Sequence, residues 1–390
     1  MNVENPLRIL SAMAALALGP WVCGADDFLG VSKDRINSII DRAYDMDPMV
    51  EQEFIALKKE YPDSPVPGFM YSIYLYSMQS HAEKYGIGDT DLSERYEKEA
   101  VASLSEAKAY AKTNNDSLEA AFVVAMSELS LAKYYVEKEK WFAGFWKTRS
   151  GLKGVRRILK RDPELHDAKM ALGMANCYLS EVPGYIKPFA ALMRFSGDME
   201  KGLEYMEEAK KGMFTRVDAA YNLAEIQWFL RGEPRLAYGE LVDLVGLHPE
   251  NLEFQFLLGQ CEFVTSRKAA GARRYEEILN GNRIERFPKM RSAIARRLGS
   301  YYGETRDFEK AVAMGELLIE ISALGNELAG LSAWGLLIKG DGLRGLGRED
   351  EAVQLYRSIE KKDKRAFEEA AIRLQEIEVL DAKRRAEDEE

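Results

Sequence analysis

The sequence predicts an all-α protein in which helix hairpins stack into a right-handed solenoid. Its composition favours helix over strand, because only 12 of 390 residues are proline while 46% are hydrophobic and 30% are charged. Short breaks with helix-stop residues, such as Asp162-Pro163 and His248-Pro249, divide the chain. A pattern of small and large residues also recurs about every 34 residues. A single hairpin cannot bury its own apolar face, so stacked neighbours complete the core.

The clearest copy of this pattern begins at Ala333 and reads AWGLLIKGDGLRGLGREDEAVQLY. Gly340 is small enough for a neighbouring helix to approach closely, and Gly347 is expected in the turn. Ala352 and Tyr356 are four residues apart, so they share one face of the second helix. These features predict two packed helices joined by a tight turn.

The repeated pattern resembles the tetratricopeptide repeat (TPR) family over nearly all of the chain after Ala25, most clearly in its C-terminal half. The resemblance implies a TPR-like scaffold that binds other molecules, without an activity of its own. Earlier copies of the pattern contain Leu298, Gly299 and Tyr302, then Leu258 and Gly259, and then Tyr221 and Ala224.

The predicted organisation has four parts. They are a signal peptide at 1–25, irregular TPR-like repeats with long inter-helix insertions at 26–215, regular repeats at 216–362, and a capping helix with a charged tail at 363–390. The insertions are expected around His81 to Leu92, Tyr134 to Thr148 and Glu181 to Asp198.

Two further resemblances are local or weak. The stretch from Pro183 to Gly212, with its Phe195-Ser196-Gly197-Asp198 turn, is similar to a segment of the inclusion-body-clearance type of TPR proteins and their bacterial relatives. That resemblance implies a scaffold and no activity. A weaker resemblance, to the periplasmic TPR subunits of TRAP-type transporters, implies an accessory that binds a small solute.

The N-terminus has the layout of a secretory signal peptide. Arg8 precedes an apolar stretch at 9–22, and the small residues Gly24 and Ala25 follow it. This stretch is shorter than the roughly 20 residues that span a membrane. We expect cleavage after Ala25 and a periplasmic protein. The alternatives are a lipid anchor at Cys23, and a retained anchor or no export.

Neither nucleic-acid binding nor catalysis is predicted. The formal net charge is −10, which repels a phosphate backbone. His81, His166 and His248 are far apart, and no nucleophile–base, phosphate-loop or metal-ligand spacing occurs. No cofactor and no metal are therefore expected. Cys177 and Cys261 are expected as buried free thiols, because they fall two repeats apart.

Two surfaces are predicted to bind. The first is the concave groove lined by the first helix of each hairpin, where amide, aromatic and arginine groups suit an extended peptide. The second is formed by aromatic residues of the insertions, which either pack on the solenoid or roof a cavity. The leading hypothesis is an exported scaffold for a protein or peptide partner, with a possible place in an envelope complex. The alternative is a solute-binding accessory of a TRAP-like transporter. The groove residues are Asn222, Phe256, Gln260, Arg296 and Ser300, and the insertion residues are Trp141, Phe145, Trp146, Tyr185, Phe189 and Met193.

Overall fold

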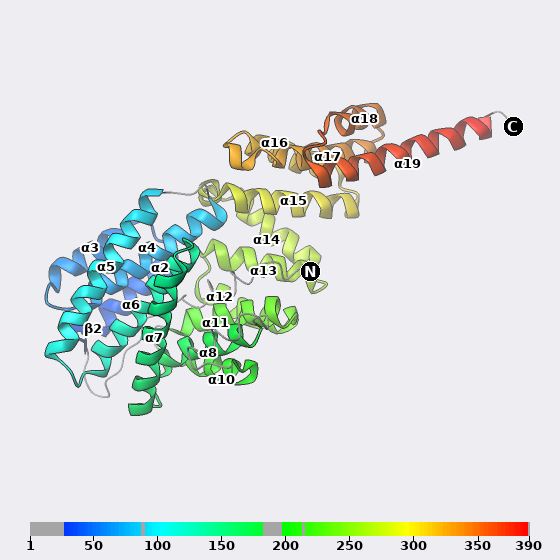
Figure 1. The fold of residues 1–390 in the computed structure, drawn as a ribbon. Helices are drawn as coiled ribbons and strands as arrows, with labels where there is room; N and C mark the ends of the chain where they lie inside the picture. Colours follow the sequence, from blue (N-terminus) through cyan, green and yellow to red (C-terminus); the bar gives the residue numbers. More distant parts are fainter. Residues whose placement is uncertain (1–26, 87–89, 182–196, 213–214, 389–390) are drawn as a thin grey trace. The chain divides into compact units, whose positions relative to one another are not determined.

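The computed structural model describes residues 27–86, 90–181, 197–212 and 215–388. Almost all of them lie in helices (Figure 1), so the predicted all-α array of helix hairpins is confirmed. The chain forms two compact units: unit 1 comprises 1–80 and 89–261, and unit 2 comprises 81–88 and 262–390. The boundaries expected at 215 and 362 concern repeat regularity and stay predictions.

Unit 1 begins with a small hairpin of strands that the sequence reading missed. The strands β1 and β2 are antiparallel and are joined by Leu29 and Gly30, both with positive φ. Helices then follow along the chain, and two of them, α4 and α13, end in residues that belong to unit 2. The elements are β1 (Asp27–Phe28), β2 (Val31–Ser32), α2 (Lys33–Tyr44), α3 (Val50–Glu60), α4 (Val66–Tyr85), α5 (Thr90–Thr113), α6 (Leu118–Glu137), α7 (Trp141–Arg161), α8 (His166–Ser180), α10 (Met199–Ala209), α11 (Thr215–Glu225), the π-helix η2 (Ile226–Leu230), α12 (Pro234–Leu247) and α13 (Leu252–Val264).

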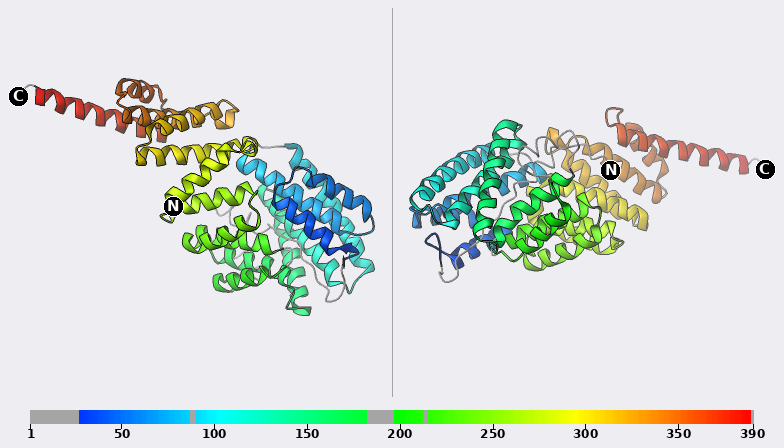
Figure 2. Two further views of the ribbon diagram at one scale, coloured as in Figure 1. Left: turned by 180° about the vertical axis from the view of Figure 1, so that it is seen from behind. Right: turned by 60° about the horizontal axis from the view of Figure 1, so that its bottom comes forward.

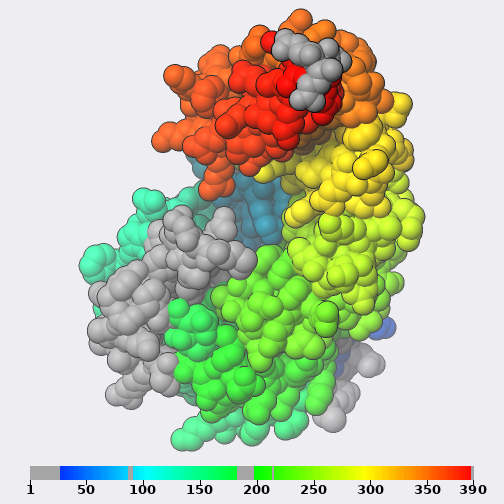
Figure 3. Space-filling model, turned by 90° about the vertical axis from the view of Figure 1, so that its right-hand side faces the viewer, coloured from blue at the N-terminus to red at the C-terminus, as the bar shows by residue number. Residues whose placement is uncertain are grey.

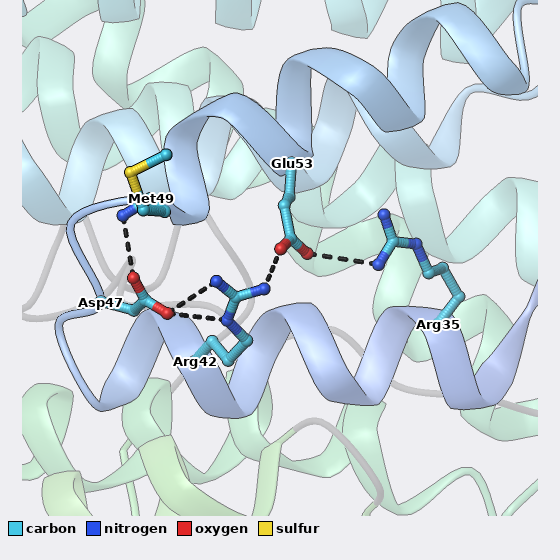
Figure 4. A network of polar contacts seen from close by, with 5 residues as sticks. All are labelled: Arg35, Arg42, Asp47, Met49 and Glu53. Atoms are coloured by element: carbon cyan, nitrogen blue, oxygen red, sulfur yellow. Dashed lines mark hydrogen bonds and ion pairs between the residues drawn. The ribbon is translucent and has the colours of Figure 1, made fainter.

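Ion pairs join the first two helices of unit 1 (Figure 4). Arg42 on α2 contacts Asp47, with Nε to Oδ2 at 2.8 Å, and also pairs with Glu53 on α3. Arg35 reaches the second oxygen of Glu53 at 3.2 Å. The backbone amide of Met49 donates to Asp47 Oδ1 at 2.8 Å, which secures the turn. These contacts fix the C-terminal end of α2, where the candidate site begins.

The insertion expected at Tyr134 to Thr148 does not exist. These residues form the end of α6 and the start of α7, and the short turn between them has Glu139 at φ 58°. The aromatic residues that suggested an insertion are part of a continuous helix. Of the other two expected insertions, residues up to Tyr85 continue α4, and 182–196 lie outside the described residues.

Two glycines let α8 and α10 pack backbone to backbone. A Cβ atom on Gly202 would lie 2.4 Å from Cys177 Sγ and 2.9 Å from the carbonyl oxygen of Gly173. Both distances are too short for a larger residue. Cys177 is therefore part of this contact. Cys177 and Cys261 are both buried thiols outside any disulfide, as predicted.

Unit 2 is also built from helix hairpins. In Figure 3 the surfaces of its later helices lie in adjacent bands, from yellow α15 through orange to red α19. The long α19 extends beyond α17 and α18 (Figure 2). The elements after α13 are α14 (Lys268–Asn280), the 3-10 helix η3 (Asn282–Arg286), α15 (Pro288–Thr305), α16 (Phe308–Ser322), the 3-10 helix η4 (Asn326–Leu328), α17 (Leu331–Gly345), α18 (Glu349–Ser358) and α19 (Lys364–Asp388).

The hairpin of α17 and α18 confirms the packing predicted for the clearest repeat. A Cβ atom on Gly340 would lie 2.5 Å from the ring of Tyr356, so only glycine leaves room for that tyrosine. Gly347 occupies the turn with φ 78°. Ala352 and Tyr356 are both buried on the same face of α18.

Among the described residues, no helix is both long and apolar enough to span a membrane.

Candidate functional site

The end of α2 contacts residues of unit 1 that follow about two hundred positions later in the chain. Asn251 Nδ2 donates to the carbonyl oxygen of Tyr44 at 2.7 Å. His248 Nδ1 lies 3.1 Å from Asp45 Oδ1, and the rings of Tyr44 and Phe254 are 6.3 Å apart. In an open solenoid each hairpin contacts only its neighbours. In unit 1 the first hairpin instead packs directly against α12 and α13.

A polar cluster surrounds this contact, with one residue from each of four helices. The hydroxyl of Tyr44 donates to Asp218 on α11, and the charges of Lys133 on α6 and Glu253 on α13 act on the same carboxyl group. Burial raises the pKa of Asp218 to about 6, although the hydrogen bond from Tyr44 and the charge of Lys133 oppose that rise. The Asp218 residue as a whole is half-buried, while protein atoms surround its carboxyl group.

Neighbouring tyrosines on α11 and α4 extend the cluster. The hydroxyl of Tyr221 lies 2.8 Å from Glu253 Oε1 and 3.1 Å from Glu225 Oε1. Tyr76 donates to Glu137 at 2.7 Å, and the ammonium group of Lys133 lies 4.8 Å from the centroid of the Tyr76 ring. These acids are hydrogen-bonded within the array, which gives them a structural role in unit 1. No group of three or more His, Cys, Asp or Glu residues in the described part of the chain could hold a metal ion.

Three of the predicted groove residues lie in unit 1 with little free surface. Asn222 is 3% exposed, and its amide donates to the carbonyl oxygen of Asp218 on the preceding turn at 2.7 Å. Phe256 is 6% exposed, and Gln260 is half-buried on α13. Their contact with a partner stays a prediction.

The other two predicted groove residues, Arg296 and Ser300, are exposed on α15 of unit 2. Ser300 Oγ donates to the carbonyl oxygen of Arg296 at 3.1 Å. The guanidinium carbon of Arg296 lies 3.8 Å from the centroid of the Trp334 ring on α17. That distance places the cation directly on the face of the ring. The pair therefore joins the first helices of two successive hairpins.

Two further arginines accompany Arg296, and the sequence reading missed both. Arg297 lies over the Phe263 ring at 5.4 Å. Arg365 is exposed at the start of α19. Burial lowers the pKa of Arg296, and the positive charges of Arg297 and Arg365 lower it further. We call Arg296, Arg297, Arg365 and Trp334 the arginine surface. The Arg-Arg doublet was visible in the sequence, but the approach of Arg365 depends on how the helices stack.

In the described part of the chain, the three arginines of this surface have no acidic partner. Within the described residues, no ion pair forms between an acidic side chain and Arg296, Arg297 or Arg365. Arg274 of the same unit differs, because it makes two bonds to buried Glu262, at 3.0 and 3.1 Å. The surface is a local excess of positive charge on an acidic protein.

The predicted aromatic surface is partly described. Trp141 and Trp146 are 38% and 56% exposed at the start of α7, while Phe145 packs against the core of unit 1. Phe142, which lies beside them, is 86% exposed. The other three residues of this prediction, Tyr185, Phe189 and Met193, lie outside the described residues.

The fold and these surfaces define a helix-hairpin repeat protein that resembles the TPR family. No family model matches the chain, and no curated protein matches it. Similar solved structures include the human IFIT1 dimer with PPP-AAAA, at 14% identity and a TM-score of 0.36 over 83% of this chain and 68% of that chain. Yeast Tom70 has 13% identity and a TM-score of 0.25 over 88% of each chain. The P58(IPK) TPR domain has 12% identity and a TM-score of 0.23 over 88% of this chain and 98% of that chain.

Proposed function

We propose that this protein is a non-catalytic scaffold that binds a protein or peptide partner on the exposed faces of the first helices of its hairpins. The observation that carries the proposal is the exposed Arg296 resting on Trp334, across α15 and α17. Two rigid helices thereby present a charged planar group beside an indole, and these residue types contribute most to protein interfaces. Ser300 adds a hydroxyl one turn further along α15.

An extended peptide suits this surface better than a compact solute. A solenoid offers a long row of first-helix faces, and a peptide lying along that row contacts several hairpins at once. The alternative, a solute-binding accessory of a transporter, depends on aromatic insertions that roof a cavity. Trp146 and Phe142 are exposed on α7, which does not support such a roof.

Export to the periplasm is a further part of the proposal, and the partner would then belong to the cell envelope. Its support is the apolar stretch at 9–22, with Arg8 before it and Ala25 after it. Cell fractionation and N-terminal sequencing test it. The expected product is periplasmic and begins at Asp26, while a cytoplasmic full-length chain would contradict export.

Site-specific photocrosslinking in the cell tests the binding function. A photoreactive residue replaces exposed Ser300 on α15, and a matched control replaces exposed Arg357 on the second helix α18. We expect a discrete crosslinked species from position 300 that position 357 does not give. Mass spectrometry then identifies the partner. Identical products from both positions, or none from position 300, would contradict a binding face on the first helices.

A further inference from the structure

We propose that the arginine surface of unit 2 binds an acidic segment of a partner protein, with side-chain carboxylates taken by Arg296, Arg297 and Arg365. This inference rests on the proposed scaffold function and names the chemical class of its partner.

The first support is the geometry of Arg296. Because its guanidinium lies on the Trp334 ring at 3.8 Å, one flat face of the group is covered. The N–H donors of a guanidinium lie at its edge, in the plane of the group. They therefore stay available for a carboxylate, which can accept two parallel hydrogen bonds from them. The stack also holds the side chain in place before binding, which lowers the entropy cost of ordering it.

The second support is the electrostatic state of the surface. Burial lowers the pKa of Arg296, and the positive charges of Arg297 and Arg365 lower it further, so both charges repel that of Arg296 in the unbound protein. Arg291, on the same helix as Arg296, has an acidic partner, because its Nη1 lies 3.4 Å from Glu320 Oε1. A ligand that brings carboxylates relieves this repulsion and supplies the missing counter-charges.

The extent of the charge favours a peptide over a nucleic acid. Binding to a phosphate backbone uses a basic stripe that many phosphates can follow. Here the arginines are few, and Glu304 and Glu368 are exposed on the same helices, α15 and α19. Those carboxylates would repel a continuous row of phosphates, but a peptide can place its acids opposite the arginines alone.

The test is fluorescence anisotropy with the full chain and a fluorescein-labelled peptide of Glu, Leu and Gly residues. The reference probe has Gln in place of every Glu. We expect the Glu peptide to bind at least about tenfold more tightly, and its affinity to fall as NaCl is raised. Arg296→Glu and Arg365→Glu should each weaken binding by about tenfold or more.

Matched variants separate this site from general charge. Arg357→Glu makes the same charge change at an exposed position of α18 and should leave affinity unchanged. Arg296→Lys should give an intermediate affinity, because lysine keeps the charge and loses the planar fork. Circular dichroism of each variant verifies that the helices are intact.

Three outcomes would overturn the inference. One is equal affinity for the Glu and Gln peptides, or an Arg296→Glu variant that binds as the unchanged protein does. The second is tighter binding of a single-stranded RNA oligomer than of the Glu peptide. The third is self-association that Arg296→Glu abolishes, which assigns the surface to a second copy of the chain. If crosslinking from position 300 succeeds while the Glu peptide shows no preference, only the acidic specificity fails. If that crosslinking also fails, the scaffold function fails with it.

Discussion

Gly315 on α16 and Gly335 on α17 face each other so closely that neither has room for a side chain. A Cβ atom on either glycine would lie 2.7 Å from the carbonyl oxygen of the other. The two helices therefore touch through their backbones at this point. The distance between α16 and α17 sets how far apart successive hairpins lie in unit 2.

Substitution of this pair tests the contact. Gly315→Ala and Gly335→Ala should each lower the free energy of unfolding by about 1–3 kcal/mol, because the added methyl group pushes two packed backbones apart. Gly303→Ala is the matched control, since its Cβ would meet nothing within 4 Å. It should raise stability by roughly 0.5–1 kcal/mol through its better helix propensity. Urea denaturation measures the free energy of unfolding of each variant. Equal changes at the three positions would contradict the backbone contact.

Substitution of Asn251 tests its long-range contact with Tyr44 in unit 1. Its amide donates to the carbonyl oxygen of Tyr44 at 2.7 Å, and its Oδ1 accepts from the amide of Phe254 at 3.0 Å, capping α13. Asn251→Ala loses both and should cost about 2 kcal/mol. Asn251→Ser keeps a cap but is too short for Tyr44, so its cost should be about half as large. The denaturation midpoints of both variants are compared with that of the unchanged protein. A serine variant as stable as the unchanged protein would mean that the Tyr44 contact contributes nothing to stability.

Asp218 should make stability fall as pH rises through the mildly acidic range. Burial raises its pKa in the folded protein to about 6, above its ordinary value of 3.8. Folding therefore favours the protonated form. The stabilisation is fully present below pH 3.8 and is lost as the pH rises to about 6. Melting temperatures across this range, compared between the unchanged protein and Asp218→Asn, measure the effect.

The asparagine variant still accepts a hydrogen bond from Tyr44 and has no proton to lose. Its melting temperature should accordingly rise relative to the unchanged protein between pH 4 and 6, the window set by the pKa of Asp218. Asp350→Asn, at an exposed position of α18, is the control and should show no such difference. If the melting temperatures of the unchanged protein, Asp218→Asn and Asp350→Asn change in parallel with pH, that result would contradict the raised pKa of Asp218.

The thiols of Cys177 and Cys261 should be unreactive in the folded protein. Both are buried, and burial raises the pKa of Cys177 to about 12, so its reactive thiolate is scarce. In a Cys23→Ser chain, Ellman's reagent at pH 8 should therefore react with almost no thiol until guanidinium is added. Fast reaction of either cysteine without denaturant would show that the core opens readily.

Local spacing explains which features were predictable. The positions of Gly340, Gly347 and Tyr356 follow from contacts within one hairpin, where helical periodicity alone decides which side chains meet. The same reasoning failed at Tyr134 to Thr148, because a run of aromatic residues in a long helix looks like an inserted segment.

Two other features of the fold leave no periodic pattern in the sequence. The contact of Tyr44 with Asn251 joins residues 207 positions apart. The effect of the Arg365 charge on Arg296 depends on how α15, α17 and α19 pack, which a single sequence does not specify. Arg296 and Ser300 were singled out from their register on one helix, while the charges that surround Arg296 emerged only from the fold.

The packing of α2 against α12 and α13 sets an order of events during synthesis. In a simple repeat array each hairpin can settle on its predecessor as it leaves the ribosome. Tyr44 and Asp45 instead have to wait until His248 and Asn251 have been translated. During that interval the amino-terminal helices lack their final covering, and a chain cut before α12 never acquires it. Early arrest of translation should consequently leave a fragment that is prone to proteolysis.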